Sequence, residues 1–219
     1  MNKNLWLLAL CQGLFLTNNV VFIAINGLVG LQLAPFGWMA TLPVMGYVVG
    51  GALSTPLVAH SQARWGRKVS FQIGLAVAVV SAALCAWAAF SASFWLLCTA
   101  TVVAGYYSAN GGLYRFAAAE LAKPDYREKA VSLVLAGGLL GAVAGPNLAS
   151  ATRTLFPVPF AGAYIALIGV ALLSMLCMTA IRFEMQPVVL NAAGQREPGR
   201  PLSCLLYTSD AADDSLRVD

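Results

Sequence analysis

Six long apolar stretches, separated by short polar segments, account for most of this chain. A helix of about 20 apolar residues is long enough to cross the hydrocarbon layer of a bilayer. The pattern therefore predicts an all-α, polytopic membrane protein with six transmembrane helices, the whole domain occupying residues 1–181. The expected spans, in chain order, are 5–31, 38–59, 69–90, 94–119, 130–150 and 159–181.

The pattern changes after the sixth stretch. Residues 182–203 are polar and contain several glycines and prolines, which is typical of a linker, so we expect a cytoplasmic linker there. Residues 204–219 begin with Cys-Leu-Leu-Tyr-Thr-Ser-Asp, which resembles the translation of an adapter used to make sequencing libraries. We therefore interpret 204–219 as a non-native tail and expect the natural protein to continue differently after residue 203.

Composition supports the membrane interpretation. Hydrophobic residues make up 59% of the chain and charged residues only 10%, whereas about 25% of a soluble domain is charged. The net charge of +4 comes from basic residues in short loops, which favours membrane orientation over nucleic-acid binding.

The distribution of basic residues predicts how the chain crosses the membrane. If the amino terminus is cytoplasmic, only Arg153 lies on the opposite side. We therefore expect both termini in the cytoplasm and the protein in a bacterial inner membrane. The cytoplasmic basic residues are then Lys3, Arg64, Arg67, Lys68, Lys123, Arg127, Lys129, Arg182, Arg196 and Arg200.

Residues for catalysis or metal binding do not form any recognisable pattern. The single histidine, His60, lies in a predicted loop, and the five cysteines show no metal-ligand spacing. Neither a phosphate-binding loop nor a nucleophile motif is present. We expect no enzyme activity, no cofactor and no metal.

Polar residues within the apolar stretches are candidates for a substrate cavity. Gln12, Asn19 and Asn26 recur every seven residues, which is close to two helical turns, so they share one face. Such a face either lines a substrate path or forms hydrogen bonds between helices, and both interpretations remain open. Tyr106 and Asn110 in the fourth stretch are further cavity candidates.

Two charged residues lie inside or beside the fourth stretch. Arg115 and Glu120 are functional candidates because ionisable groups are costly inside a membrane. Both lie near the predicted cytoplasmic end, where an arginine can also extend to the headgroups. The remaining stretches carry no acidic residue at mid-membrane depth.

The segment between the second and third stretches reads Ala-His-Ser-Gln-Ala-Arg-Trp-Gly-Arg-Lys. It resembles the signature of the major facilitator superfamily, Gly-x-x-x-Asp-Arg-x-Gly-Arg-Lys/Arg. An alanine replaces both the first glycine and the aspartate, which the family uses in a cytoplasmic charge network. The matching residues are Arg64, Gly66, Arg67 and Lys68.

A second resemblance lies in the fifth stretch. Gly137, Gly141 and Gly145 recur every four residues and are followed by Pro146. Glycines at this spacing form a flat face that another helix can approach closely. The glycine–proline pattern resembles the fifth-helix motif of exporters and antiporters in the same superfamily, where this face packs against the second half of the protein.

The resemblance implies that the chain is the amino-terminal half of a twelve-helix transporter, each half built from two inverted three-helix repeats. It also implies efflux-like secondary transport of a small molecule by alternating access, coupled to a proton or another ion, with the missing half and the lipid bilayer as partners. We expect the isolated half to transport nothing. Two alternatives remain open: a half-transporter that works as a homodimer, and a six-helix scaffold without transport.

Overall fold

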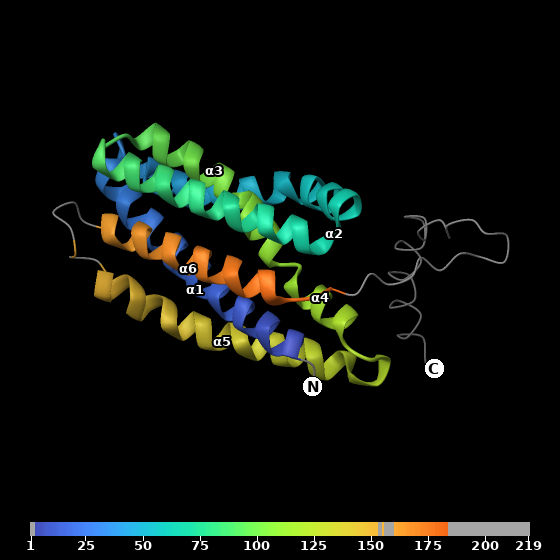
Figure 1. Cartoon of the computed structure of the whole chain (residues 1–219). Coiled ribbons are helices and arrows are strands. Elements are labelled where there is room, and N and C mark those ends of the chain that lie inside the picture. Colours follow the sequence, from blue (N-terminus) through green and yellow to red (C-terminus); the bar gives the residue numbers. More distant parts are fainter. Residues whose placement is uncertain (1–2, 153–154, 156–159, 184–219) are drawn as a thin grey trace, which may run out of the picture. The chain divides into compact units, whose positions relative to one another are not determined.

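The computed structural model describes residues 3–152, 155 and 160–183, and every regular element in this part of the chain is a helix. Residues up to Phe183 form one compact unit, shown in Figure 1. The predicted tail and nearly all of the predicted linker lie outside the described residues. The helices are α1 (Lys3–Leu33), η1 (Gly37–Met39), α2 (Leu42–Phe90), α3 (Phe94–Gly111), α4 (Tyr114–Leu121), η2 (Pro124–Tyr126), α5 (Arg127–Thr152) and α6 (Ala161–Ala180).

Long apolar helices confirm that this is an all-α protein suited to a membrane. Within the described residues, four helical segments are long and apolar enough to cross a bilayer. One of them contains 54 residues, more than twice the roughly 20 that a single crossing needs. The four segments are Lys3–Leu33, Gly37–Phe90, Arg127–Thr152 and Ala161–Ala180.

The helix boundaries differ from the predicted ones in two places, and the first is the segment between the predicted second and third spans, where two helices meet at a kink. We expected a loop around residues 60–68, but helix continues on both sides of Gly66 within α2. Only Gly66 leaves helical geometry, with φ 81° and ψ 166°. This left-handed conformation favours glycine because it has no Cβ. No neighbouring atom lies within 4 Å of the position a Cβ would take, so the backbone bend alone requires the glycine.

The second departure is the predicted fourth span, 94–119, which is divided. Helix α3 ends at Gly111, a turn follows at Gly112 and Leu113, and α4 begins at Tyr114. Two consecutive glycines have low helix propensity, which explains the break. The Gly112 amide still donates to the Ser108 carbonyl over 3.2 Å, so α4 continues from α3 after one turn of altered backbone.

Helix α1 lies inside the bundle, where it packs against both α5 and α6, while α2 packs against α3 and α6. Figure 1 shows α1 and α6 between α5 on one side and the α2–α3 pair on the other. Buried apolar side chains form two clusters along α1. One surrounds its residues 5–15 and the other its residues 21–29. The short stretch of α1 between the two clusters is polar.

Candidate functional site

Three consecutive polar residues, Thr17, Asn18 and Asn19, occupy the middle of α1 between the two apolar clusters. Successive residues of an α-helix point about 100° apart, so these side chains face three different neighbours. We call them the central polar triplet. Thr17 Oγ1 donates to the Gly141 carbonyl of α5 (3.0 Å), Asn18 Nδ2 donates to the Leu167 carbonyl of α6 (3.1 Å), and Asn19 Oδ1 accepts from the Tyr47 hydroxyl of α2 (2.7 Å).

The members of the triplet differ in accessibility. Thr17 and Asn18 are buried, with 7% and 4% of their surface exposed, whereas Asn19 is only half-buried. A buried amide in an apolar bundle is costly unless it is hydrogen-bonded, and the Asn18 bond to α6 meets that requirement. Asn19 is therefore the most exposed member of the triplet, whereas its partner Tyr47 is buried, with 4% of its surface exposed.

The predicted stripe Gln12–Asn19–Asn26 does not act as one surface. Asn26 is fully buried, and its Oδ1 accepts a 2.8 Å hydrogen bond from the Tyr164 hydroxyl of α6. Its Nδ2 donates to the Phe22 carbonyl, also over 2.8 Å. Gln12 is buried as well, and its Oε1 has no hydrogen-bond partner within the described part of the chain. The three residues share one side of α1 but meet different surroundings.

The two candidates in α3 also differ. Asn110 is 1% exposed, accepts a 3.1 Å hydrogen bond from Ser70 of α2, and donates to the Tyr106 carbonyl over 3.3 Å. These contacts give Asn110 a role in joining α3 to α2. The Tyr106 side chain is half-buried, and its part in lining a cavity stays a prediction.

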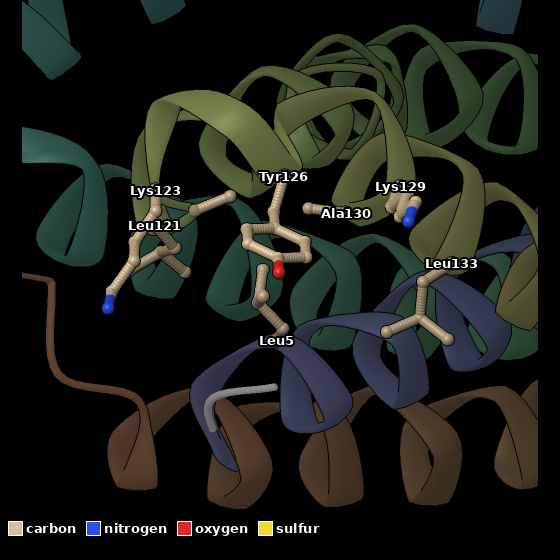
Figure 2. A pocket seen from close by; sticks show the side chains of 8 residues that line it. Leu5, Leu121, Lys123, Tyr126, Lys129, Ala130 and Leu133 are labelled. Atoms are coloured by element: carbon tan, nitrogen blue, oxygen red, sulfur yellow. The ribbon is translucent and has the colours of Figure 1, made fainter.

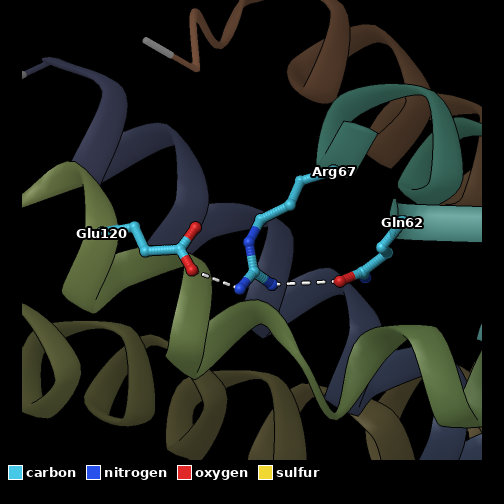
Figure 3. A network of polar contacts seen from close by, with 3 residues as sticks. All are labelled: Gln62, Arg67 and Glu120. Carbon is cyan, nitrogen blue, oxygen red and sulfur yellow. Dashed lines mark hydrogen bonds and ion pairs between the residues drawn. The ribbon is translucent and has the colours of Figure 1, made fainter. Parts of the chain in front are cut away.

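The four residues of the signature segment include two that contact distant elements. Arg67 forms an ion pair with Glu120 of α4, and its other terminal nitrogen donates to Gln62 Oε1 over 3.1 Å (Figure 3). The predicted membrane charge Glu120 is thus paired at the surface, its side chain 42% exposed. Arg115 is exposed, and its guanidinium lies 4.9 Å from the ring centroid of Phe116.

The neighbouring lysine of the same segment holds the end of α6. Lys68 Nζ donates to the carbonyls of Thr179 (2.6 Å) and Ile181 (2.9 Å). The last carbonyls of a helix have no partner within the helix and carry partial negative charge, so a cation there is stabilising. In α2, then, two adjacent residues, Arg67 and Lys68, connect to α4 and α6.

The glycine face of α5 is occupied by α1. A Cβ added at Gly137 or Gly141 would overlap the backbone of Ala9 or Gly13, and one at Gly145 would lie 3.2 Å from Val20. Within the described residues this face meets α1, and packing against a second half of the protein stays a prediction. Pro146 follows these glycines within α5 and is exposed.

Sequence reasoning missed Thr17, Asn18 and Tyr47. The seven-residue spacing of polar residues in the first apolar stretch includes Asn19 but neither of its two neighbours. Three polar residues in a row within an apolar stretch are themselves a signal, because on a helix they require three separate partners. Tyr47 carried no such signal, since an isolated tyrosine is common in membrane helices.

A family model described as Major Facilitator Superfamily matches residues 5–211. The chain is 33% identical over 208 residues to the riboflavin transporter RfnT of Brucella anthropi, which covers 93% of this chain and 51% of that protein. It is 29% identical over 126 residues to YdeG, an uncharacterized MFS-type transporter of Bacillus subtilis, covering 58% of this chain and 29% of that one. The chain thus spans about half the length of RfnT, and its match to YdeG covers 29% of that protein.

Among solved structures, the chain is similar to the crystal structure of the human organic anion transporter MFSD10 (TETRAN). The TM-score is 0.61 with 18% sequence identity, and the match covers 83% of this chain and 48% of that one. At this level of identity the similarity concerns the fold. Here too the matched part is about half of the larger protein.

Proposed function

This chain belongs to the Major Facilitator Superfamily, and from that membership we propose that it is the amino-terminal half of a secondary transporter. The complete protein would move a small organic molecule across a bacterial inner membrane by alternating access, with both ends of this half in the cytoplasm. The matches to about half of RfnT and half of MFSD10 support the assignment as a half. Six spans in two inverted repeats are the corresponding architecture.

The observation that carries the proposal is the half-buried amide of Asn19 at the middle of α1, which is held by the buried Tyr47 of α2. Substrate sites of such transporters lie near mid-membrane between repeats. Because Asn19 Oδ1 already accepts from the buried Tyr47 hydroxyl, the Asn19 Nδ2 group is the hydrogen-bond donor left for a substrate, next to an aromatic residue. That chemistry suits a planar, polar heteroaromatic molecule, and the relative RfnT is named for riboflavin. We take a flavin as the first substrate to test.

We propose that a carboxylate for proton coupling, if transport is proton-driven, does not come from the described part of this chain. Its acidic residues there are Glu120, Asp125 and Glu128, all at the α4–α5 end of the bundle and far along the chain from the central polar triplet. A proton-coupled transporter needs a carboxylate or another titratable group near the substrate path. For proton-driven transport, we therefore assign the coupling group to the other half.

The test is riboflavin counterflow in proteoliposomes that contain the product of the complete gene. Asn19→Ala should raise KM at least about fivefold, because a substrate hydrogen bond is worth about 1 kcal/mol. The matched variant Asn18→Ala removes an amide bonded to α6 and should lower stability while leaving KM within about twofold. Equal effects of both variants on KM would contradict a substrate contact at Asn19.

The chain as it stands provides a second test. Proteoliposomes with only these 219 residues should show no flux, since half of the cavity wall is absent. If this chain alone gives flux and crosslinking shows that it forms a specific dimer, the homodimer alternative is supported and the proposal that the chain is half of a longer transporter is contradicted. A complete protein that binds no flavin and moves none of a panel of small organic molecules would favour the scaffold.

A further inference from the structure

A cavity of about 550 Å³ opens at the end of the bundle where α1 begins and α4 passes into α5. Its size falls within the range of roughly 300–1,000 Å³ that is usual for small-molecule sites. Four elements contribute to it: α1, α4, η2 and α5. The lining residues are Leu5, Leu121, Ala122, Lys123, Tyr126, Lys129, Ala130 and Leu133.

The lining combines two kinds of surface. Figure 2 shows Tyr126 between Lys123 and Lys129, with its hydroxyl directed toward Leu5. The Lys129 ammonium lies 5.5 Å from the ring centroid of Tyr126, within the range of a cation–π contact. Most of the other lining residues are leucine and alanine. Cationic and hydroxyl groups thus adjoin an apolar floor in one cavity.

No acidic residue is among those that line the cavity. Asp125 and Glu128 belong to the same segment, but both are exposed and lie outside the lining. The two lysines are therefore not neutralised from within the cavity. Its charge complements an anion.

The position of the cavity along the helices indicates the kind of anion. Helix α1 starts at Lys3 and α5 at Arg127, and apolar spans follow directly in both. The lysines thus lie where the apolar spans begin, which we place at the depth of lipid headgroups, while Leu5 lies in the first turn of α1 and Leu133 about one turn after Lys129 in α5. Basic pockets between helices at this depth bind anionic headgroups.

The geometry points to a binding site for an anionic phospholipid, with the headgroup phosphate held by Lys123 and Lys129 and the start of an acyl chain against Leu5 and Leu133. The Tyr126 ring lies between the two lysines, next to the apolar floor that includes Leu5. A soluble phosphate would use the lysines and leave the apolar floor in contact with water, so the leucines favour a lipid over a free anion. This site is separate from the Asn19–Tyr47 pair and does not depend on the transported substrate.

Native mass spectrometry of the purified 219-residue chain tests the site. The chain is incubated with equal amounts of phosphatidylglycerol and phosphatidylcholine that carry identical acyl chains. We expect preferential retention of phosphatidylglycerol. Lys123→Gln with Lys129→Gln should lower that retention at least about tenfold, since each lysine near an anionic headgroup contributes measurably to binding. Retention of phosphatidylcholine should stay within about twofold.

A matched control separates the cavity from the general positive charge of this end. Arg64→Gln with Arg127→Gln removes two exposed cations that do not line the cavity, and should lower phosphatidylglycerol retention less than about twofold. Equal losses in the two double variants would overturn the site. Lys123, Lys129, Arg64 and Arg127 are all exposed, so far-UV circular dichroism should be the same for every variant.

A competition experiment and a further variant distinguish a bound lipid from a bound free anion. An excess of inorganic phosphate or glycerol phosphate should leave bound phosphatidylglycerol in place, and displacement by either would identify a phosphate site instead. Leu133→Ser should lower phosphatidylglycerol retention about threefold, because it removes apolar contact with the acyl chain. Unchanged retention in Leu133→Ser with an unaltered fold would contradict the acyl-chain contact.

Discussion

Helix α1 contacts its two main neighbours in different ways. Toward α5, the backbones approach so closely that a Cβ at Gly141 would overlap the Gly13 carbonyl. Toward α6, side chains span the gap: Asn18 donates to the Leu167 carbonyl, and Asn26 accepts from Tyr164. One interface depends on the absence of side chains and the other on the presence of polar ones.

The two interfaces should therefore respond differently to amino-acid substitution. At the α5 interface, an added carbon meets backbone atoms, which cannot move without shifting a helix. At the α6 interface, a lost hydrogen bond leaves its partner unpaired, and small side-chain movements can relieve part of that cost. In membranes, apolar helices gain no hydrophobic energy from meeting each other, so both means of association are needed.

The largest effect should come from breaking the glycine interface. Gly141→Leu forces α1 and α5 apart and should lower the free energy of unfolding by more than about 3 kcal/mol, the upper end of overpacking costs. The measurement is unfolding in mixed micelles with increasing dodecyl sulfate, followed by far-UV circular dichroism. Gly169→Ala is the control, because no atom lies within 4 Å of the Cβ position there, and it should change stability by less than about 1 kcal/mol. Similar losses in the two variants would show that glycine content, and not the α1 contact, matters.

Removing the fully buried amide at the α6 interface should have an intermediate effect. Asn26→Ala leaves the Tyr164 hydroxyl without its acceptor and should cost about 2 kcal/mol in the same unfolding measurement. A double-mutant cycle with Tyr164→Phe should give a coupling energy of about 1 kcal/mol. A coupling energy near zero would mean that the bond contributes nothing to the association of α1 and α6.

The smallest effect should come from Thr17, which forms a hydrogen bond at the closely packed α1–α5 interface. It lies on the glycine side of α1, yet its hydroxyl donates to the Gly141 carbonyl and to the Gly13 carbonyl (2.9 Å). Thr17→Val keeps the branched shape and removes both bonds, so we expect a loss of about 0.6 kcal/mol, the average for hydrogen bonds between membrane helices. A loss as large as that of Asn26→Ala would show that close packing alone does not hold α1 against α5.

Length and apolarity were enough to predict the helical membrane class, because a bilayer allows few other structures. The ends of the helices were predicted less precisely, and the number of spans stays a prediction. The polar residues around Gly66 suggested a loop, but polar side chains are compatible with helix outside the hydrocarbon, and a single left-handed residue makes the bend. The glycine pair at residues 111–112 interrupts the fourth stretch, although its apolar pattern continues to residue 119.

Contacts between helices were the least predictable part. Glycines every four residues indicated a face for close approach, but spacing along one helix contains no information about the partner, which is α1. Likewise, the heptad spacing of Asn19 and Asn26 placed them on one side of α1, whereas their partners, Tyr47 and Tyr164, come from α2 and α6. Pairings of this kind follow from three-dimensional packing and not from any single stretch of sequence.

The bond between Lys68 and the end of α6 sets an order of events during synthesis. Its acceptor carbonyls, on Thr179 and Ile181, are 111 and 113 residues further along the chain. Because a protein is made from its amino terminus, the ammonium emerges from the ribosome long before these carbonyls exist. The contact that holds α2 to the end of α6 can therefore form only after the last described helix has been made.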